Sequence, residues 1–247
     1  MQYLSIVDHH APFEELYLKV RARENRLLAD EVVARLPDIS PEMSPNYKEW
    51  KARSGSFKRL KKYFQSTKES KALLDVGCGN GWAAAGLAGN ELLEVAAVDV
   101  NEEELLQAER IFQKPNLLFY YGNIFEDIFP PSSFDFIVLN SSAQYFEDLK
   151  TLVERLFYFL KKGGEIHILD TPFYSDSEWE VAKSRTQSYF RSIGCPEMAK
   201  HYFHHRLAEL APFKYETVSK KGILDKLRSP FSDQVPANFI WIKIQHS

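Results

Sequence analysis

Three glycines at alternate positions, directly after an aspartate, form the most informative stretch of the sequence. Residues 71–81 read KALLDVGCGNG, so Asp75 ends a short apolar run and Gly77, Gly79 and Gly81 follow it. Alternate glycines allow a sharp turn and remove the side chains that would keep a ligand away from the backbone. The helix-forming residues that follow would place free N–H groups beside that ligand. The stretch is typical of a strand, a tight ligand-binding turn and a helix.

The spacing of these glycines differs from that of a dinucleotide fingerprint. The fingerprint reads G-x-G-x-x-G, with a third glycine or alanine placed for helix packing. Here Trp82 follows Gly81 directly. The spacing therefore disfavours a dehydrogenase, although that class is kept as an alternative. A second alternative is an ordinary turn between a strand and a helix, with no ligand.

From residue 71 onward, patterns typical of strands alternate with patterns typical of helices. The predicted strands are residues 72–76, 93–98, 117–121, 134–139 and 165–169, and the predicted helices between them are residues 82–88, 102–112 and 149–160. Such alternation predicts a parallel sheet wrapped by helices, with right-handed crossovers. Ligands of such sheets bind beyond the carboxyl ends of the strands, where the strand order reverses.

Polar residues stand where several of these strands end. Asp99 could accept hydrogen bonds from both hydroxyls of a ribose, or it could cap the following helix. The side-chain oxygen of Asn123 could accept from an adenine amino group. The apolar residues Val100 and Ile124 could hold the base between them, and the backbone carbonyl of Asn140 could meet an ammonium group. These positions together favour a nucleoside ligand.

Residues 1–70 precede the alternating region and have the pattern of helices. Apolar residues recur at helical spacing from Phe13 to Leu36, where Pro37 ends the pattern. A second helix is predicted over residues 47–64.

The second helix is strongly basic. Its basic residues are Lys48, Lys51, Arg53, Lys58, Arg59, Lys61 and Lys62. Such a run is most often a solvated face, but it could also bind phosphate, a carboxylate or RNA. In an intermediate arrangement, one residue such as Arg53 turns inward to hold a carboxylate while the others stay in water.

After residue 170 the alternation loosens. The predicted elements are helices over residues 177–193 and 197–210, and strands over residues 213–219 and 239–244. Just before this region, Gly163 and Gly164 suit the end of helix 149–160.

The composition excludes several classes of protein. The chain has 247 residues, of which 45% are hydrophobic, enough for one large or two small domains with a full core. A net charge of −3 and a pI near 6.2 argue against a DNA-binding protein. The start of the sequence has no signal-peptide pattern, and no apolar run could span a bilayer. Two cysteines, Cys78 and Cys195, form no disulfide framework and no metal-ligand spacing. We expect a soluble, reduced, cytoplasmic protein without a bound metal.

Five segments in this order resemble the class I S-adenosylmethionine-dependent methyltransferases, close to the large group that acts on small molecules. The segments are LDVGCGNG at 74–81, Val98-Asp99, Gly122-Asn123-Ile124, SFDFI at 133–137 and LKKGG at 160–164. The resemblance implies an α/β fold, with a Rossmann-like, seven-stranded, mostly parallel sheet, helices on both faces and a C-terminal antiparallel hairpin. It divides the chain into a helical cap over residues 1–70 and a cofactor-binding domain over residues 71–247, with a helical insert at about 171–210 that completes the cap.

The same resemblance implies S-adenosylmethionine as the cofactor. The loop from Gly77 to Gly81 would hold its methionine end, Asp99 its ribose, and Asn123 would lie by its adenine, where relatives more often carry aspartate. The implied cofactor-binding residues are Asp75, Gly77, Cys78, Gly79, Gly81, Asp99, Val100, Asn123, Ile124 and Asn140.

No general base follows from the sequence. Many relatives carry a histidine after the fourth strand, where this chain has Gln144 and Tyr145. A base is needed only if the methyl acceptor must lose a proton. The candidates that could face the transfer site are Tyr145, Asp170, His201, His204 and His205. Tyr145 could instead be a packing aromatic, and the histidines could lie on an exposed helix. His201 and His205 have the spacing of a helical metal pair, but no acidic or cysteine partner stands near them in the sequence.

The expected acceptor is a small organic molecule, such as a sugar or an aromatic metabolite. The end of the fourth strand, Asn140-Ser141-Ser142-Ala143, lacks the Asn/Asp-Pro-Pro-aromatic signature of relatives that methylate amines of bases or glutamine amides. The residues expected to contact the acceptor are Trp50, Arg53, Tyr145 and His201. The alternatives are an RNA or protein methyltransferase that uses the basic residues 48–62, and a protein that binds S-adenosylmethionine without catalysis.

Overall fold

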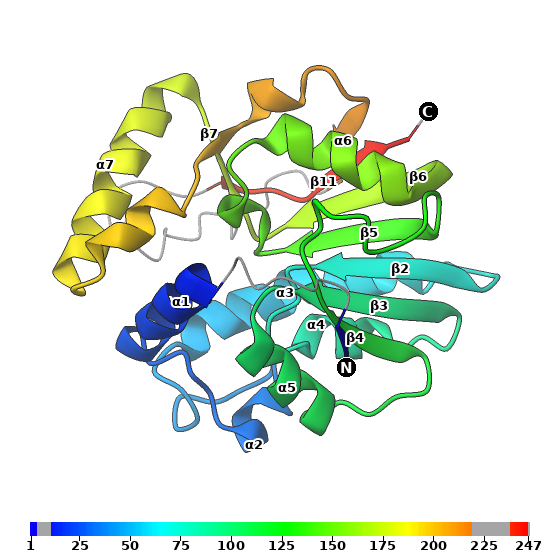
Figure 1. The fold of residues 1–247 in the computed structure, drawn as a ribbon, viewed down its shortest axis with the longest axis horizontal. Coiled ribbons are helices and arrows are strands. Elements are labelled where there is room, and N and C mark those ends of the chain that lie inside the picture. Colours follow the sequence, from blue (N-terminus) through cyan, green and yellow to red (C-terminus); the bar gives the residue numbers. More distant parts are fainter. Residues whose placement is uncertain (4–10, 219–237, 247) are drawn as a thin grey trace.

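One twisted β-sheet forms the centre of the molecule, with helices on both faces (Figure 1). The computed structural model describes residues 1–3, 11–218 and 238–246. The strand order is β1-β4-β3-β2-β5-β6-β11-β9. The pairs from β1 to β6 are parallel, and β11 pairs antiparallel with β6 and with β9. The strands are β1 (Gln2–Tyr3), β2 (Lys71–Val76), β3 (Leu93–Asp99), β4 (Leu117–Tyr121), β5 (Phe134–Asn140), β6 (Leu160–Leu169), β9 (Tyr215–Thr217) and β11 (Ile242–Gln245).

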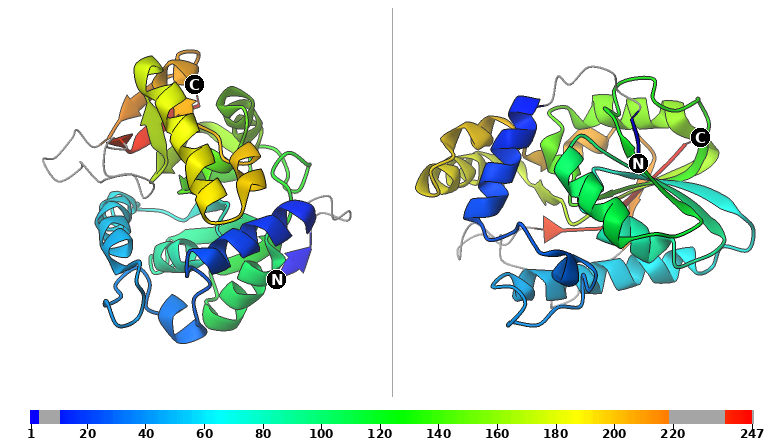
Figure 2. Two further views of the ribbon diagram at one scale, coloured as in Figure 1. Left: turned by 90° about the vertical axis from the view of Figure 1, so that its left-hand side faces the viewer. Right: turned by 60° about the horizontal axis from the view of Figure 1, so that its bottom comes forward.

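Helices cover both faces of the sheet (Figure 2), and each face carries a separate apolar core. Helices α3 (Tyr47–Phe64), α4 (Trp82–Leu87) and α5 (Glu102–Ile111) contribute to one core, and α6 (Leu149–Phe159) to the other. Because side chains alternate along a strand, Leu73 of β2 lies in the first core and its neighbour Leu74 in the second. A continuous apolar strand therefore has both faces covered, as parallel sheets require.

The strand order reverses between β2 and β5. The chain runs outward from β2 to β3 and β4, then crosses back to β5, which pairs with β2 on its other side. This reversal opens a crevice at the carboxyl ends of β2 and β5, the position where sheets of this kind bind ligands.

A helical cap lies at the end of the sheet where this crevice opens. Helices α1 (Ala11–Arg23) and α7 (Asp176–Ser192) both lie at this end of the molecule (Figure 1), and the short helix η2 (Pro196–Lys200) contacts each of them. Val20 of α1 packs against Phe190, Cys195 and Met198 in a third apolar cluster. The short helices α2 (Asp30–Val33), η1 (Ala143–Tyr145), η2 (Pro196–Lys200) and η3 (Leu207–Leu210) complete the helical elements of the described residues.

The predicted architecture is confirmed, with additions that the sequence did not indicate. The seven expected strands and the antiparallel C-terminal pairing are present, and α3 spans the predicted residues 47–64. The two-residue strand β1 adds an edge to the sheet. A separate three-stranded sheet joins β10 (Asn238–Phe239), β7 (Pro172–Tyr174) and β8 (His205–Arg206). Strands this short carry no recognisable alternation, so their pairing depends on tertiary contacts.

Two local predictions are wrong. Gly163 and Gly164 do not end a helix: α6 stops at Phe159, and the next residue, Leu160, is already extended with φ −84° and ψ 135°. Both glycines lie in β6, where the backbone of Gly164 approaches the carbonyl of Asp135. Residues 197–210 do not form one helix, because η2 ends at Lys200 and β8 then pairs with β7.

The pattern from Phe13 to Leu36 also divides into two helices. Helix α1 ends at Arg23, and α2 covers only residues 30–33. Asn25 between them has φ 55°, a left-handed conformation that stops a helix.

We predict that Gly81→Ala destabilises the fold by about 2–4 kcal/mol, since overpacking adds to the cost of a left-handed backbone. Gly81 has φ 73°, and a Cβ there would lie 2.6 Å from the Phe119 ring and 2.8 Å from the Ala108 Cβ. The matched control is Gly163→Ala, with φ 78° and no heavy atom within 4 Å of the added Cβ, which should cost about 1 kcal/mol. Urea unfolding measures both. Equal losses would contradict the packing explanation.

Candidate cofactor and acceptor site

The glycine loop after β2 is held against the end of β3. The N–H groups of Gly77 and Cys78 donate to the Val98 carbonyl at 2.9 and 3.2 Å. Gly77, Gly79 and Gly81 all have positive φ, at 71°, 52° and 73°. A Cβ on Gly79 would lie 2.9 Å from a Glu104 carboxylate oxygen. The loop therefore needs glycine for its conformation and for the close approach of its neighbours.

Asp99 organises the turn rather than the start of α5. One carboxylate oxygen accepts from the Gly79 N–H at 2.7 Å and the other from the Asn101 N–H at 2.9 Å. The cap of α5 is Asn101, whose side chain accepts from the Glu104 N–H at 2.9 Å. Burial raises the pKa of Asp99, and the backbone N–H groups oppose that rise. Asp99 thus presents a carboxylate at the mouth of the loop.

Asp75 is buried at the end of β2 with neither carboxylate oxygen hydrogen-bonded. Burial, and then the charge of Asp99, raise its pKa to about 7. An orphaned buried carboxylate is costly, and it is expected where a ligand supplies donors or positive charge. This observation fits a cofactor that carries an ammonium and a sulfonium.

The crevice forms a cavity of about 450 Å³ that reaches from the strand ends to the cap. Of the predicted cofactor-binding residues, it is lined by Gly77, Cys78, Gly79, Asp99, Val100, Asn123, Ile124 and Asn140. Asp75 and Gly81 do not line it: Asp75 lies behind the loop, and Gly81 faces Phe119 and Ala108. The side-chain oxygen of Asn123 accepts from the Phe125 N–H at 3.0 Å, which orients the amide.

The four predicted acceptor residues, Trp50, Arg53, Tyr145 and His201, line the same cavity. They come from α3, η1 and the segment after η2, so the fold brings together residues far apart in the chain. Helix α1 adds Phe13 and Tyr17, which sequence reasoning did not single out. Their rings lie 6.2 and 5.7 Å from the Tyr145 ring, and the Phe13 ring lies 5.5 Å from His201. The side of the cavity that the cap forms is therefore largely aromatic.

Arg53 turns inward, as in the intermediate arrangement. It donates to the Ser141 hydroxyl at 3.0 Å and pairs with Glu49 at 2.9 Å. The other basic residues of α3, Lys48, Lys51, Lys58, Arg59, Lys61 and Lys62, are exposed. Arg26 also pairs with Glu49. Burial alone would raise the pKa of Glu49, but the charges of Arg53 and Arg26 outweigh it and lower the pKa to about 2.

A second buried acid, Glu104, was not identified from the sequence. It belongs to a first helical turn with three glutamates, a pattern that the helix dipole alone explains. In the fold it lines the cavity, where burial raises its pKa to about 7 against the opposing charge of Arg21. Only the packing of α1 against α5 distinguishes Glu104 from its neighbours Glu102 and Glu103.

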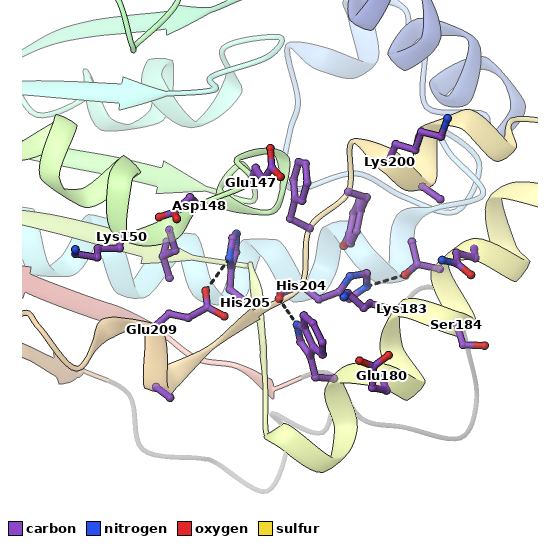
Figure 3. A pocket seen from close by; sticks show the side chains of 18 of the residues that line it. Glu147, Asp148, Lys150, Glu180, Lys183, Ser184, Lys200, His204, His205 and Glu209 are labelled. Atoms are coloured by element: carbon purple, nitrogen blue, oxygen red, sulfur yellow. Dashed lines mark hydrogen bonds and ion pairs between the residues drawn. The ribbon is translucent and has the colours of Figure 1, made fainter.

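The remaining histidine candidates lie elsewhere. A second cavity, of about 890 Å³, lies between α7, the start of α6 and residues 199–212, and both His204 and His205 line it (Figure 3). His204 is bonded to the Thr186 hydroxyl at 2.9 Å, and His205 lies between the Ala143 carbonyl at 3.0 Å and Glu209 at 3.3 Å. His201 and His205 are therefore not a helical metal pair. Within the described part of the chain, no cluster of His, Cys, Asp or Glu could hold a metal ion.

Of the other candidates, Asp170 bonds to Ser56 of α3, and its φ is 50°. His167, within β6, is fully buried and accepts from the Trp241 indole at 3.1 Å. It is part of the core.

Comparisons with known proteins agree with this geometry. Residues 74–168 match the model of a methyltransferase domain. An uncharacterised methyltransferase of Mycobacterium tuberculosis is 30% identical over 114 residues, which are 45% of this chain and 57% of the relative. A demethylmenaquinone methyltransferase of Bacillus licheniformis is 29% identical over 147 residues, which are 56% of this chain and 62% of the relative. The chain thus spans little more than half the length of these relatives.

Solved structures share the fold. The YcgJ protein of Bacillus subtilis superposes with a TM-score of 0.55 at 18% identity, over 78% of this chain and 96% of that one. A phosphoethanolamine N-methyltransferase of Haemonchus contortus, solved with S-adenosylmethionine, gives a TM-score of 0.52 at 19% identity, over 77% and 51% of the two chains. Residues 74–168 thus match a methyltransferase domain, and the sheet order and the glycine loop resemble those of the class I S-adenosylmethionine-dependent methyltransferases. In the ranges that the structure describes, no helix is both long and apolar enough to cross a membrane.

We predict that Asp75 makes the stability of the ligand-free protein pH-dependent. The unfolded chain ionises Asp75 near its ordinary value of 3.8, whereas the folded protein keeps it protonated up to about pH 7. The folded state therefore binds more protons in this window, and the free energy of unfolding falls as pH rises through it. Asp75→Asn should stabilise the ligand-free protein at pH 7.5 by on the order of 2–4 kcal/mol and flatten the profile.

Urea unfolding between pH 5 and pH 7.5 measures this dependence. The control is Glu94→Gln, which removes an exposed carboxylate from β3. An Asp75→Asn profile as steep as that of the unchanged protein would refute the assignment.

Proposed function

We propose that this protein transfers a methyl group from S-adenosylmethionine to a small organic acceptor by in-line displacement. The observation that carries this proposal is the single cavity shared by two sets of residues. The carboxyl ends of the strands line one side, and α1, α3, η1 and His201 line the other. A cofactor on the first set would face an acceptor on the second.

The cofactor half consists of backbone donors and carboxylates. When bound, S-adenosylmethionine supplies an electrophilic methyl group on a sulfonium. The glycine loop would receive the methionine end, with the Asp75 carboxyl group behind it, and Asp99 would accept hydrogen bonds from the ribose. Val100 and Ile124 would contact the base beside Asn123, and the Asn140 carbonyl would accept from the ammonium group.

The acceptor half orients the reacting atom. Holding two reactants at about 3–3.5 Å in line is the main contribution such a site can make. Burial raises the pKa of Tyr145, so its hydroxyl stays protonated at neutral pH. Tyr145 would therefore orient the acceptor by a hydrogen bond rather than remove its proton. Trp50 and His201 would contact the acceptor beside it.

The chemical identity of the acceptor depends on the cap. Relatives carry the names of different acceptors, demethylmenaquinone in one and malonyl-[acyl-carrier protein] in another. The methyltransferase-domain match covers residues 74–168 and leaves the cap outside it. We assign the choice of acceptor to residues 1–70 and 171–210, which supply the cap.

We predict that the protein binds S-adenosylhomocysteine and that Asp99→Asn weakens this binding at least about tenfold. The asparagine side chain has only one oxygen that accepts hydrogen bonds, and it lacks the negative charge of the aspartate. Isothermal titration calorimetry measures both. The control is Glu103→Gln, an exposed acid four residues away, which should bind like the unchanged protein. Binding of NAD instead would support a dehydrogenase and overturn the proposal. Binding without methyl transfer to any acceptor in a metabolite screen would support the non-catalytic alternative.

A second prediction concerns Arg53. If Arg53 holds the cofactor carboxylate, Arg53→Ala should weaken S-adenosylhomocysteine binding about tenfold, the usual worth of a charge-assisted hydrogen bond. Lys61→Ala is the matched control, since Lys61 is an exposed cation on the same helix. An unchanged affinity in Arg53→Ala would remove Arg53 from the cofactor site. Loss of salt-sensitive RNA binding in Lys61→Ala would instead favour the RNA-methyltransferase alternative.

A further inference from the structure

Arg21 of α1 brings a cation into the wall of the cavity without using its hydrogen-bond donors. Its side chain lines the cavity and is 19% exposed. The Nε atom has no hydrogen-bond partner, and among the described residues the guanidinium makes only an ion pair with Glu24, at 3.7 Å. Arginine stays protonated in proteins and carries five N–H donors. The cavity is therefore the place where a ligand could meet these donors.

The charges on the cap side of the cavity leave one cation in excess. Arg26 pairs with Glu24 at 3.1 Å and also with Glu49, and Arg53 pairs with Glu49 at 2.9 Å. Because Glu24 is also the partner of Arg21, two carboxylates serve three guanidinium groups. The ion pair of Arg21 is the longest of these contacts. The surplus positive charge therefore lies with Arg21.

Glu104 is a further acid near Arg21, but it belongs to the cofactor half. Its carboxylate lies over the glycine loop, beside Gly79, and it forms no ion pair with Arg21. Burial raises the pKa of Glu104 to about 7, the charge of Arg21 opposes that rise, and the charge of Asp99 adds to it. The positive charges of S-adenosylmethionine would balance Glu104 and Asp99. Arg21 then remains for the acceptor.

Arg21 acts on the part of the cavity where Tyr145 would orient the acceptor. Burial raises the pKa of Tyr145, and among the surrounding charges that of Arg21 opposes the rise most. The Arg21 guanidinium lies 4.9 Å above the Tyr17 ring, and the Tyr17 and Phe13 rings lie 5.7 and 6.2 Å from the Tyr145 ring. A guanidinium and a phenol beside aromatic rings match a carboxylate that is carried by an aromatic body.

We propose that Arg21 binds a carboxylate of the methyl acceptor, and that this acceptor is a carboxylic acid with an aromatic body. The inference rests on the proposed function, because it concerns the acceptor of the same reaction. A guanidinium holds a carboxylate through two parallel hydrogen bonds, and the Tyr145 hydroxyl would donate a third. One surplus positive charge matches one carboxylate better than a doubly charged phosphate. Arg21 also lies in residues 1–70, part of the cap to which we assign the choice of acceptor.

The test uses the full chain saturated with S-adenosylhomocysteine. The probes are benzoate, its uncharged match benzamide, and inorganic phosphate. Ligand-observed NMR, which detects weak binding, and thermal melting compare the unchanged protein with Arg21→Met, Arg21→Lys and Arg23→Met. Arg23 is an exposed arginine in the last turn of the same helix, so Arg23→Met is the matched control.

We expect benzoate to bind the unchanged protein and raise its Tm, and benzamide and phosphate to bind at least about tenfold more weakly. Arg21→Met should bind benzoate at least about tenfold more weakly than the unchanged protein. Arg21→Lys should recover part of the affinity, and Arg23→Met should lose none. The affinity of Arg21→Met for S-adenosylhomocysteine should stay within about twofold of the unchanged value, which places Arg21 outside the cofactor half.

Several results would overturn the inference. They are equal benzoate binding by Arg21→Met and the unchanged protein, equal binding of benzoate and benzamide, no binding of benzoate, and tighter binding of phosphate than of benzoate. Loss of S-adenosylhomocysteine binding in a folded Arg21→Met would assign Arg21 to the cofactor instead. If Arg21→Met does not fold, Arg21→Lys and the comparison of benzoate with benzamide still decide.

Failure of the proposed function would be recognised separately. If S-adenosylhomocysteine does not bind the unchanged protein, the proposed function fails. Benzoate binding by the ligand-free protein, compared between Arg21→Met and Arg23→Met, then decides whether Arg21 is an anion site.

Discussion

The hydrogen bond from the Gly79 N–H to the Asp99 carboxylate is the contact on which the cofactor half of the site depends. It joins the loop after β2 to the last residue of β3, at the edge where the two parallel strands end. The N–H groups of Gly77 and Cys78 add two bonds to the Val98 carbonyl. Without these hydrogen bonds, the left-handed backbone at the three alternate glycines would not be fixed in one conformation. The ligand-binding surface is therefore made mainly by main-chain atoms whose position follows from strand pairing.

Charge is distributed unevenly across the cavity. Asp75, Asp99 and Glu104 are buried near the loop, and burial raises the pKa of each. Such carboxylates are costly in an empty protein and favourable beside a cationic ligand. On the opposite side of the cavity, Arg26 and Arg53 both pair with Glu49. Positive and negative charges on that part of the wall therefore nearly cancel. The two halves of the cavity thus differ in their charge.

Segments distant in the sequence build the cap. Helix α1 packs through Val20 on the α7–η2 region, and Tyr17, Tyr145 and His201 meet above the strand ends. The segment from 171 onward contributes through short helices and two-residue strands rather than through one long helix. Short elements of this kind bend closely over a cavity, and their conformation is set by the partners they pack on.

Local patterns were enough to place most of the proposed cofactor-binding residues at one cavity. Glycine spacing, strand alternation and the acids at strand ends act over a few residues, so Gly77, Gly79, Asp99 and Asn140 could be placed from the chain alone. The inward turn of Arg53 was one of several options, because periodicity does not say which member of a basic helix faces the protein. Glu104 and Tyr17 became candidate site residues only in the fold. Their places depend on the contacts between α1 and α5, and no local preference of the backbone encodes which helix packs against which.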